Sequence, residues 1–150
     1  MTNHEAFMRE AIAEARMAEA RGEVPIGAVL VRDGVVIARS GNTRENDRDV
    51  LGHAEIKVLQ EGCRVLGSWR LSGCTLYVTL EPCPMCAGAI LNARVERVVY
   101  GAADPAAGCV GSKINLFALD FNHTPLVRAG VLEGECAQLL RDFFARRRPQ

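Results

Sequence analysis

The 150-residue sequence has no long apolar run. Its longest clearly apolar stretch, Val24–Val31, spans 8 residues and includes a proline and a glycine. A membrane-spanning helix needs about 20 apolar residues, so we expect none. Charged residues such as Glu5, Arg9 and Glu10 occupy the start of the chain, which excludes the apolar core of a secretory signal. These absences predict a cytoplasmic protein without a membrane partner.

The sequence also lacks net charge and is poor in lysine. Its 18 basic side chains balance 18 acidic ones, which excludes a uniformly basic surface as the basis of nucleic-acid binding. Basic residues gather at the C-terminus as Arg146, Arg147 and Arg148. That triplet fits a solvated helix end that complements the helix dipole and fits a phosphate contact equally well.

Low-complexity tracts and linkers are also missing, and 49% of the residues are apolar. A chain of this size buries about 68–70% of its unfolded surface, so it needs no structural metal or disulfide to be stable. We therefore expect one domain over residues 1–150, in which any metal is free to be catalytic. Without an export signal, the six cysteines are expected to be reduced thiols or metal ligands.

Hydrophobic periodicity and turn residues predict alternating helices and strands. Thr2 and Glu5 form a capping-box pattern before a helical repeat, and Asp33-Gly34 is typical of a tight hairpin turn. The predicted elements are a helix ending at Gly22, strands at Ile26–Val31 and Val35–Ala38, a loop at Gly41–Gly52, a helix from Ala54 to Gly62, a strand at Thr75–Leu80, a helix at Pro84–Leu91, a strand at Val95–Tyr100, a loop at Asp104–Ser112, a short helix at Ile114–Leu119, an edge strand at Leu126–Val131 and a helix at Glu135–Arg147.

Helices separate the later strands in this order, which implies crossover connections and a sheet covered on both faces. The predicted fold is an α/β protein, a three-layer α/β/α sandwich.

Three residues have the spacing of metal ligands. Cys83 and Cys86 lie three positions apart at a helix start, where the helix N-terminus favours thiolates, and His53 opens another helix. Pro84 suits the first helical turn. Two thiolates and an imidazole provide three protein ligands, and a tetrahedral Zn²⁺ with three protein ligands keeps one position for water. This pattern predicts a catalytic zinc site.

Other interpretations of these residues remain open. A closed structural zinc site needs a fourth ligand, and the remaining cysteines and histidines have no partner at ligand spacing. A redox Cys-x-x-Cys fits poorly with the central Pro84-Met85 pair. Glu55 follows His53 by two positions, which do not share a helical face. We therefore predict that Glu55 is a general acid–base group beside the metal rather than a ligand.

The two motifs, His53-Ala54-Glu55 and Pro82-Cys83-Pro84-Met85-Cys86, resemble the His-x-Glu and Pro-Cys-x-x-Cys signature of the zinc-dependent nucleoside and base deaminases. Within this superfamily, similarity to the tRNA-specific adenosine deaminases extends from about Ala6 to Arg148. The most similar stretches are Pro25–Val29, Asn42, Leu76–Cys83, Cys86–Ile90, Arg97–Ala102, Asn122-His123 and Asp142–Phe144.

The resemblance implies a cytidine-deaminase-like fold with a five-stranded mixed sheet, a homodimer, and conversion of the wobble adenosine (position 34) of a tRNA anticodon to inosine. It implies one Zn²⁺ per subunit on His53, Cys83 and Cys86, with Glu55 as the proton shuttle. The implied partner is the anticodon arm of a tRNA, and no DNA partner is expected.

The resemblance also implies a set of substrate-binding residues: Ile26, Asn42, Ala54, Asp104, Asn122 and Phe144. From the residues alone, Asn42 equally fits an Asx turn, Asn122 turn chemistry before Pro125, and Phe144 a core position. One departure from the family pattern is Ala106, where relatives often carry a lysine that could contact phosphate.

Two other functions remain open at this point. Guanine deaminases can share Glu-Pro-Cys-Pro-Met-Cys, so the chain could act on a free base or nucleoside. The second of these functions is that of a non-catalytic RNA-binding module with a structural zinc. The small residues after Cys86 fit close packing against a second copy and equally fit packing against the sheet.

Overall fold

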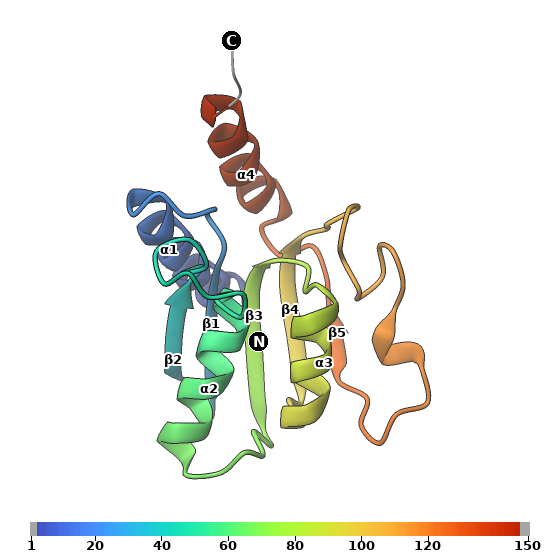
Figure 1. Ribbon diagram of the computed structural model, residues 1–150. Coiled ribbons are helices and arrows are strands. Elements are labelled where there is room, and N and C mark those ends of the chain that lie inside the picture. The colour runs from blue at the N-terminus through green and yellow to red at the C-terminus, as the bar shows by residue number, and fades with distance from the viewer. Residues whose placement is uncertain (1–2, 148–150) are drawn as a thin grey trace.

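The computed structural model describes residues 3–147 and contains a five-stranded sheet in the order β2-β1-β3-β4-β5 (Figure 1). In chain order the elements are α1 (His4–Ala20), β1 (Gly27–Arg32), β2 (Val35–Gly41), α2 (Ala54–Leu66), β3 (Cys74–Leu80), α3 (Pro84–Ala93), β4 (Arg97–Ala102), the 3₁₀ turn η1 (Leu116–Ala118), β5 (Leu126–Arg128) and α4 (Glu133–Arg147).

The first two strands form the predicted hairpin. Asp33 and Gly34 have φ angles of 52° and 76°, and such positive values at both central residues are typical of the tight turn that matches strand twist. Strands β1 and β2 pair antiparallel, with Arg32 opposite Val35 beside the turn. The predicted antiparallel hairpin is therefore confirmed.

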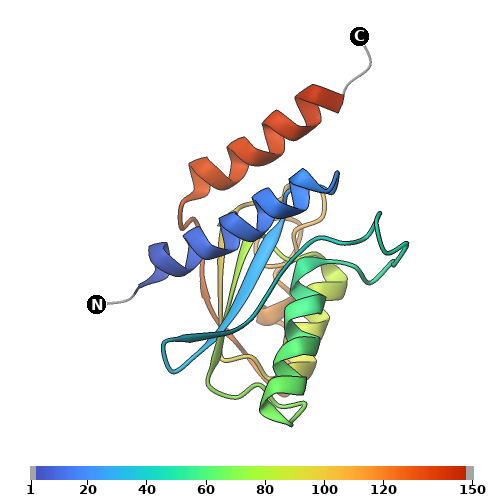
Figure 2. The ribbon, with the colours of Figure 1, turned by 90° about the vertical axis from the view of Figure 1, so that its left-hand side faces the viewer.

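Helices cover both faces of the sheet, which confirms the three-layer sandwich. Figure 2 shows α1 and α4 on one side of the sheet and α2 and α3 on the other. Along β1 the side chains alternate: Val29 and Val31 join the core beneath α1 and α4, while Ala28 and Leu30 join the core beneath α2 and α3. The central strands β1, β3 and β4 are thus buried on both faces, as is usual beneath crossover helices.

The sheet is mixed. β1 pairs antiparallel with β2 and β3, whereas β3, β4 and β5 run parallel. In Figure 1, α2 and α3 both begin at the upper end of the sheet, where β3 and β4 end. Helix N-termini and the carboxyl ends of parallel strands therefore meet at one edge, the usual place for a site in such folds.

Several predicted boundaries were wrong. Helix α2 continues past Gly62 to Leu66, and Gly67, with φ 64°, ends it. Gly62 instead allows α2 to pack closely against β1, because a Cβ there would lie 2.4 Å from Leu30 Cδ2. The predicted helix near residues 114–119 is a single 3₁₀ turn. β5 is an edge strand, as expected, but it ends at Arg128.

The predicted N-terminal capping box includes Thr2, which is outside the described residues. The N-cap of α1 is Asn3, whose side chain makes no capping hydrogen bond.

Candidate active site

His53 and Cys83 occupy equivalent places at the starts of two helices. His53 is the N-cap of α2 and Cys83 is the N-cap of α3, both with extended backbone conformations, and Pro84 takes the first position of α3. Neither side chain makes a capping hydrogen bond, so both remain available to bind something else. The β2–α2 and β3–α3 loops thus bring the imidazole and the thiol together.

The three predicted ligands converge. His53 Nδ1 lies 3.6 Å from Cys83 Sγ and 3.5 Å from Cys86 Sγ, and the three ligand atoms are within 4.8 Å of one another. A tetrahedral zinc with ordinary Zn–N and Zn–S bonds spans about 3.6 Å between a nitrogen and a sulfur ligand. The donor set and its spacing therefore fit Zn²⁺. Among the described residues, no further histidine, cysteine or carboxylate belongs to this group.

The pKa of each of the three side chains depends on its neighbours in the cluster. The neighbouring Cys86 thiol, with help from His53, lowers the pKa of Cys83 to about 4. The Cys83 sulfur and burial raise the pKa of Cys86, and Cys83 also raises the pKa of His53. Metal binding at these residues would release protons from them, because metal ligands must be thiolates and a neutral imidazole.

Glu55 lies in the first turn of α2 with 4% of its surface exposed. Burial raises the pKa of its carboxyl group to about 7, because a charged carboxylate loses its solvation there. A carboxyl group that is poised near neutral pH can both take and give a proton. The structure therefore places a group suited to acid–base chemistry beside the ligand cluster without making it a ligand.

A cavity of about 460 Å³ opens in front of this cluster. Eight of the residues predicted for the site line it: Ile26, Asn42, His53, Ala54, Glu55, Cys83, Asp104 and Phe144. Cys86 is fully buried and joins the site through its contact with His53. Asn122 is not part of this cavity and lies in a separate hollow beside α3, together with Gly88 and His123.

Comparisons with known proteins agree with this geometry. The family model described as MafB19-like deaminase matches residues 2–148. The chain belongs to this deaminase family. The tRNA-specific adenosine deaminase of Bacillus subtilis (strain 168) is 57% identical over 145 residues, which is 96% of this chain and 90% of that protein. The resemblance drawn from the two motifs is therefore confirmed.

Solved structures give the same result. One from a study of A-to-I editing by tRNA:A34 deaminases at the wobble position has 53% identity and a TM-score of 0.88, covering 90% of this chain and 99% of that one. The guanine deaminase of Bacillus subtilis is more distant, at 35% identity and a TM-score of 0.68 over 97% of this chain and 94% of that one. The expected deaminase fold is thus confirmed.

Asn42 of the deaminase lines the cavity and also forms the local turn that its sequence position allowed. Its Oδ1 accepts a hydrogen bond of 3.0 Å from the backbone N–H of Arg44, which is the Asx-type turn. Its own backbone N–H donates to the carbonyl of Ile26 at 3.0 Å, and only 5% of its surface is exposed. Because Oδ1 is engaged, the side-chain amide nitrogen is the group left to donate to a ligand in the cavity.

Glu81 organises the loop on the opposite side of the cavity. Its carboxylate accepts backbone N–H groups of Asp104, Val110 and Ser112, each at 3.0 Å. Burial opposes its ionisation, but these bonds and the Ser112 hydroxyl outweigh burial and lower the pKa of Glu81. No local pattern predicts this role of Glu81, because its partners lie more than 20 residues away along the chain.

Further residues of the cavity were also missed. Arg44 lines it from the β2–α2 loop, and Val24, Leu80 and Leu140 supply apolar surface. The one signal that could have found Arg44 is its place two positions after Asn42. The others look like ordinary core residues in the sequence.

The C-terminal arginines that the structure describes are bound to the protein itself. Arg146 pairs with Glu19, while Arg147 lies 4.2 Å from the centre of the Phe143 ring and donates to the carbonyl of Gly22 at 3.4 Å. These contacts fasten the end of α4 to the end of α1. Arg148 is outside the described residues.

The remaining cysteines form no disulfide. All six cysteines lie within residues 3–147 and none is disulfide-bonded, which agrees with the expectation of reduced thiols or metal ligands. Within the same range, no helix is long and apolar enough to cross a membrane.

Proposed function

We propose that the protein hydrolyses the wobble adenosine, nucleotide 34, of a tRNA anticodon to inosine and releases ammonia. The observation that carries this proposal is the buried Glu55 beside the His53, Cys83 and Cys86 cluster at the base of one cavity. The relatives named as tRNA-specific adenosine deaminases, together with the A34 editing structure, supply the substrate.

One Zn²⁺ per chain is the proposed cofactor, held by His53, Cys83 and Cys86. When bound, zinc supplies Lewis-acid activation of the water that attacks C6 of the base.

Glu55 handles the protons in this proposal. Its carboxylate takes a proton from the attacking water and delivers a proton to N1 of the adenine. It then takes the second proton of that water from the hydroxyl now on C6 and passes it to the 6-amino group. The C6–N bond breaks, ammonia leaves and the C6 carbonyl of inosine forms. One water is consumed and one ammonia released, so a single side chain that alternates between base and acid completes the cycle.

The cavity holds the base after it has left the stacked loop. The Asn42 amide nitrogen donates to an acceptor on the purine or its ribose, and Ile26 and Ala54 contact the base. Phe144, with 49% of its surface exposed, offers a ring for stacking a neighbouring nucleotide, and Asp104 contacts the loop from the other side. Any contact from Asn122 must come from outside this cavity.

A homodimer and a cytoplasmic location complete the proposal. The outer face of α3 offers a surface for a second copy, because Gly88 has open space beside it and Asn92 is exposed. Phe121, with 50% of its surface exposed, lies beside the same hollow as Gly88. Exposed apolar surface of this kind is typical of an interface.

The test is mass-spectrometric detection of inosine after zinc-loaded protein meets an anticodon stem-loop with adenosine 34. Free adenosine, guanine and cytidine serve as parallel substrates, and Glu55→Ala serves as the inactive control. Inosine in the stem-loop alone supports the proposal. Turnover of a free base or nucleoside overturns it in favour of a small-molecule deaminase, and no turnover favours a binding module.

A further inference from the structure

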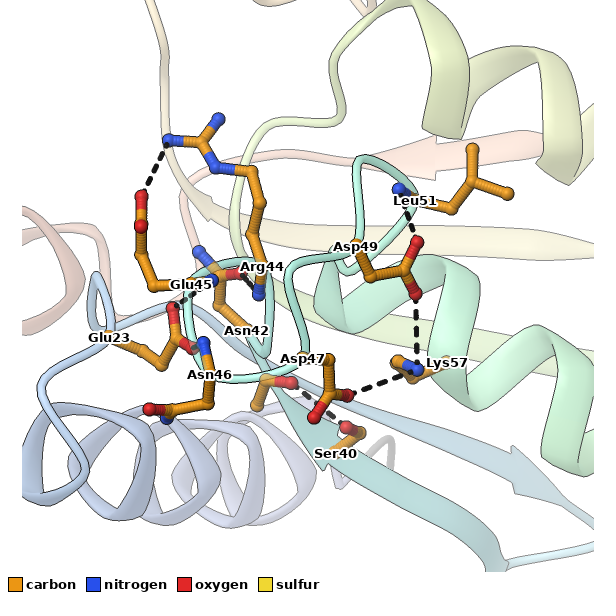
Figure 3. Close-up of polar contacts among 11 residues, drawn as sticks. Glu23, Ser40, Asn42, Arg44, Glu45, Asn46, Asp47, Asp49, Leu51 and Lys57 are labelled. Carbon is orange, nitrogen blue, oxygen red and sulfur yellow. Dashed lines mark hydrogen bonds and ion pairs between the residues drawn. The ribbon is translucent and has the colours of Figure 1, made fainter.

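A second glutamate, Glu23, is fully buried near the cavity but does not line it. It follows α1 at a helix end of the Schellman type: Gly22, with φ 87°, donates to the carbonyl of Glu19, and Glu23 donates to that of Ala18. The left-handed conformation of Gly22 turns the chain so that the Glu23 side chain points beneath the β2–α2 loop (Figure 3).

Both carboxylate oxygens of Glu23 are used by that loop. Oε1 accepts the backbone N–H of Glu45 at 3.1 Å, and Oε2 accepts that of Asn46 at 2.6 Å. Two successive amides converge on one anion, as in the backbone nests that bind anions. Burying a carboxylate is costly unless it is hydrogen-bonded, and bonds to a charged group are the strong ones. The loop conformation is therefore tied to Glu23.

The tied segment is continuous with the substrate cavity. Glu45 follows Arg44, which lines the cavity and whose N–H holds Asn42 Oδ1. Thr43 donates to the carbonyl of Gly52 at 2.8 Å, next to His53, so the loop closes on itself at the site. A displacement of residues 45–46 must move Arg44 and loosen the bond that orients the Asn42 amide.

The far half of the loop has an anchor of its own. Lys57 of α2 lies 3.5 Å from both Asp47 and Asp49, and Asp49 accepts the N–H of Leu51 at 2.9 Å (Figure 3). The side chains of Lys57, Asp47 and Asp49 are more exposed than that of Glu23. Backbone bonds link the two halves, since the Asp49 N–H donates to the Arg44 carbonyl at 3.0 Å and the Arg48 N–H to the Glu45 carbonyl at 3.3 Å. Loss of Glu23 therefore loosens the segment that carries Asn42 and Arg44 without detaching it from the rest of the loop.

We propose that Glu23 is a positioning residue: through the backbone amides of Glu45 and Asn46 it fixes the loop that presents Asn42 and Arg44 to the substrate. It touches neither the substrate nor the metal ligands. Its effect on RNA turnover rests on the proposed function, whereas its effect on the loop does not.

The test compares Glu23→Gln with Glu14→Gln. Glu14 is another buried glutamate of the same region, 3.7 Å from Arg39 and outside the cavity lining, so it controls for the loss of a buried charge. In Glu23→Gln we expect faster hydrogen exchange at the Glu45 and Asn46 amides, unchanged zinc content, and a KM for the stem-loop raised about tenfold with kcat changed by less than about threefold. In Glu14→Gln, KM and the exchange of these amides should stay near wild type.

A double variant gives a second readout. If Glu23 acts through Asn42, adding Glu23→Gln to Asn42→Ala raises KM by much less than the tenfold seen alone. If Glu23→Gln does not fold, Asn46→Pro removes one of the two hydrogen bonds from the loop side, and we expect faster exchange at the Glu45 amide and the same rise in KM.

The proposal is overturned if the loop amides stay protected in Glu23→Gln, or if KM rises equally in Glu14→Gln. Failure of the wild-type protein to act on the stem-loop would count against the proposed function alone, because the exchange measurement still decides the role of Glu23.

Discussion

His53 Nδ1 and Cys83 Sγ lie 3.6 Å apart although 30 positions separate these residues in the chain. Each residue occupies the N-cap position of a helix, and the two helices start at the same edge of the sheet. The helix N-termini favour thiolate at Cys83, and the fixed caps hold both ligands in place before any metal binds.

Removing one ligand should abolish tight zinc binding. In Cys86→Ser we expect zinc affinity to fall by more than about 100-fold, since loss of an outer partner alone costs 10–100-fold. Cys74→Ser is the matched control, because Cys74 is a buried thiol at the opposite end of β3. Competition with a chromophoric chelator measures both affinities, and equal affinities would refute the ligand assignment.

Replacing Glu55 should stop the chemistry without removing the metal. Glu55→Gln keeps the shape of the side chain but cannot take a proton. We therefore expect deamination to slow by about 10²–10⁴-fold at unchanged zinc content. Single-turnover inosine formation, with zinc measured on the same sample, checks this. Activity within a few-fold of wild type would remove Glu55 from the proton path.

A side chain at position 62 should destabilise the folded protein. A Cβ at Gly62 would lie 2.4 Å from Leu30 Cδ2, so Gly62→Ala should lower the free energy of unfolding by about 1–3 kcal/mol. Gly134→Ala is the control, because nothing lies within 4 Å of the position of its Cβ, and its effect should stay within about 0.5 kcal/mol. Urea unfolding compares them, and equal stability of the two variants would show that α2 does not press on β1 at this point.

His4 should make stability depend on pH. Burial, followed by the charges of Arg97 and Arg128, lowers the pKa of His4 below its usual 6.5, and its Nδ1 lies 2.8 Å from the Tyr77 hydroxyl. The folded state therefore prefers the neutral ring, whose stabilising contribution is complete above the unfolded pKa and is lost as the pH falls through the folded pKa.

His4→Gln removes this titration. The stability advantage of wild type over His4→Gln should be largest near pH 8 and shrink on the acid side of 6.5. Thermal unfolding at several pH values measures the difference between the two proteins. A difference that grows toward acid pH would mean that the folded state prefers the charged ring.

Local patterns predicted the parts of the fold that depend on neighbouring residues. Asp33-Gly34 gave the hairpin because its conformational preference is intrinsic, and Cys83 and Cys86 gave the ligand pair because a helix start fixes their spacing. Gly62 was misread as a helix end because a glycine that allows close packing and a glycine that ends a helix look alike in one sequence. The contact with Leu30 exists only in the folded sheet.

The two carboxylates that hold the loops at the cavity, Glu23 and Glu81, could not be predicted from the sequence. Glu23 binds amides 22 and 23 positions away, and Glu81 binds amides 23 to 31 positions away, so no local spacing reports these bonds. For Asn122, the family resemblance implied a role without giving a position in the fold. Its resemblance to a family position placed it with the substrate, but the fold places it outside the cavity of its own chain.

The most direct test of the proposed function is the ratio of kcat/KM for an anticodon stem-loop with adenosine 34 to kcat/KM for free guanine, measured with one zinc-loaded preparation. A cavity framed by two anchored loops and an exposed Phe144 predicts a ratio far above one, with inosine found only at nucleotide 34. A ratio below one, or inosine at other adenosines of the loop, would contradict wobble-specific editing.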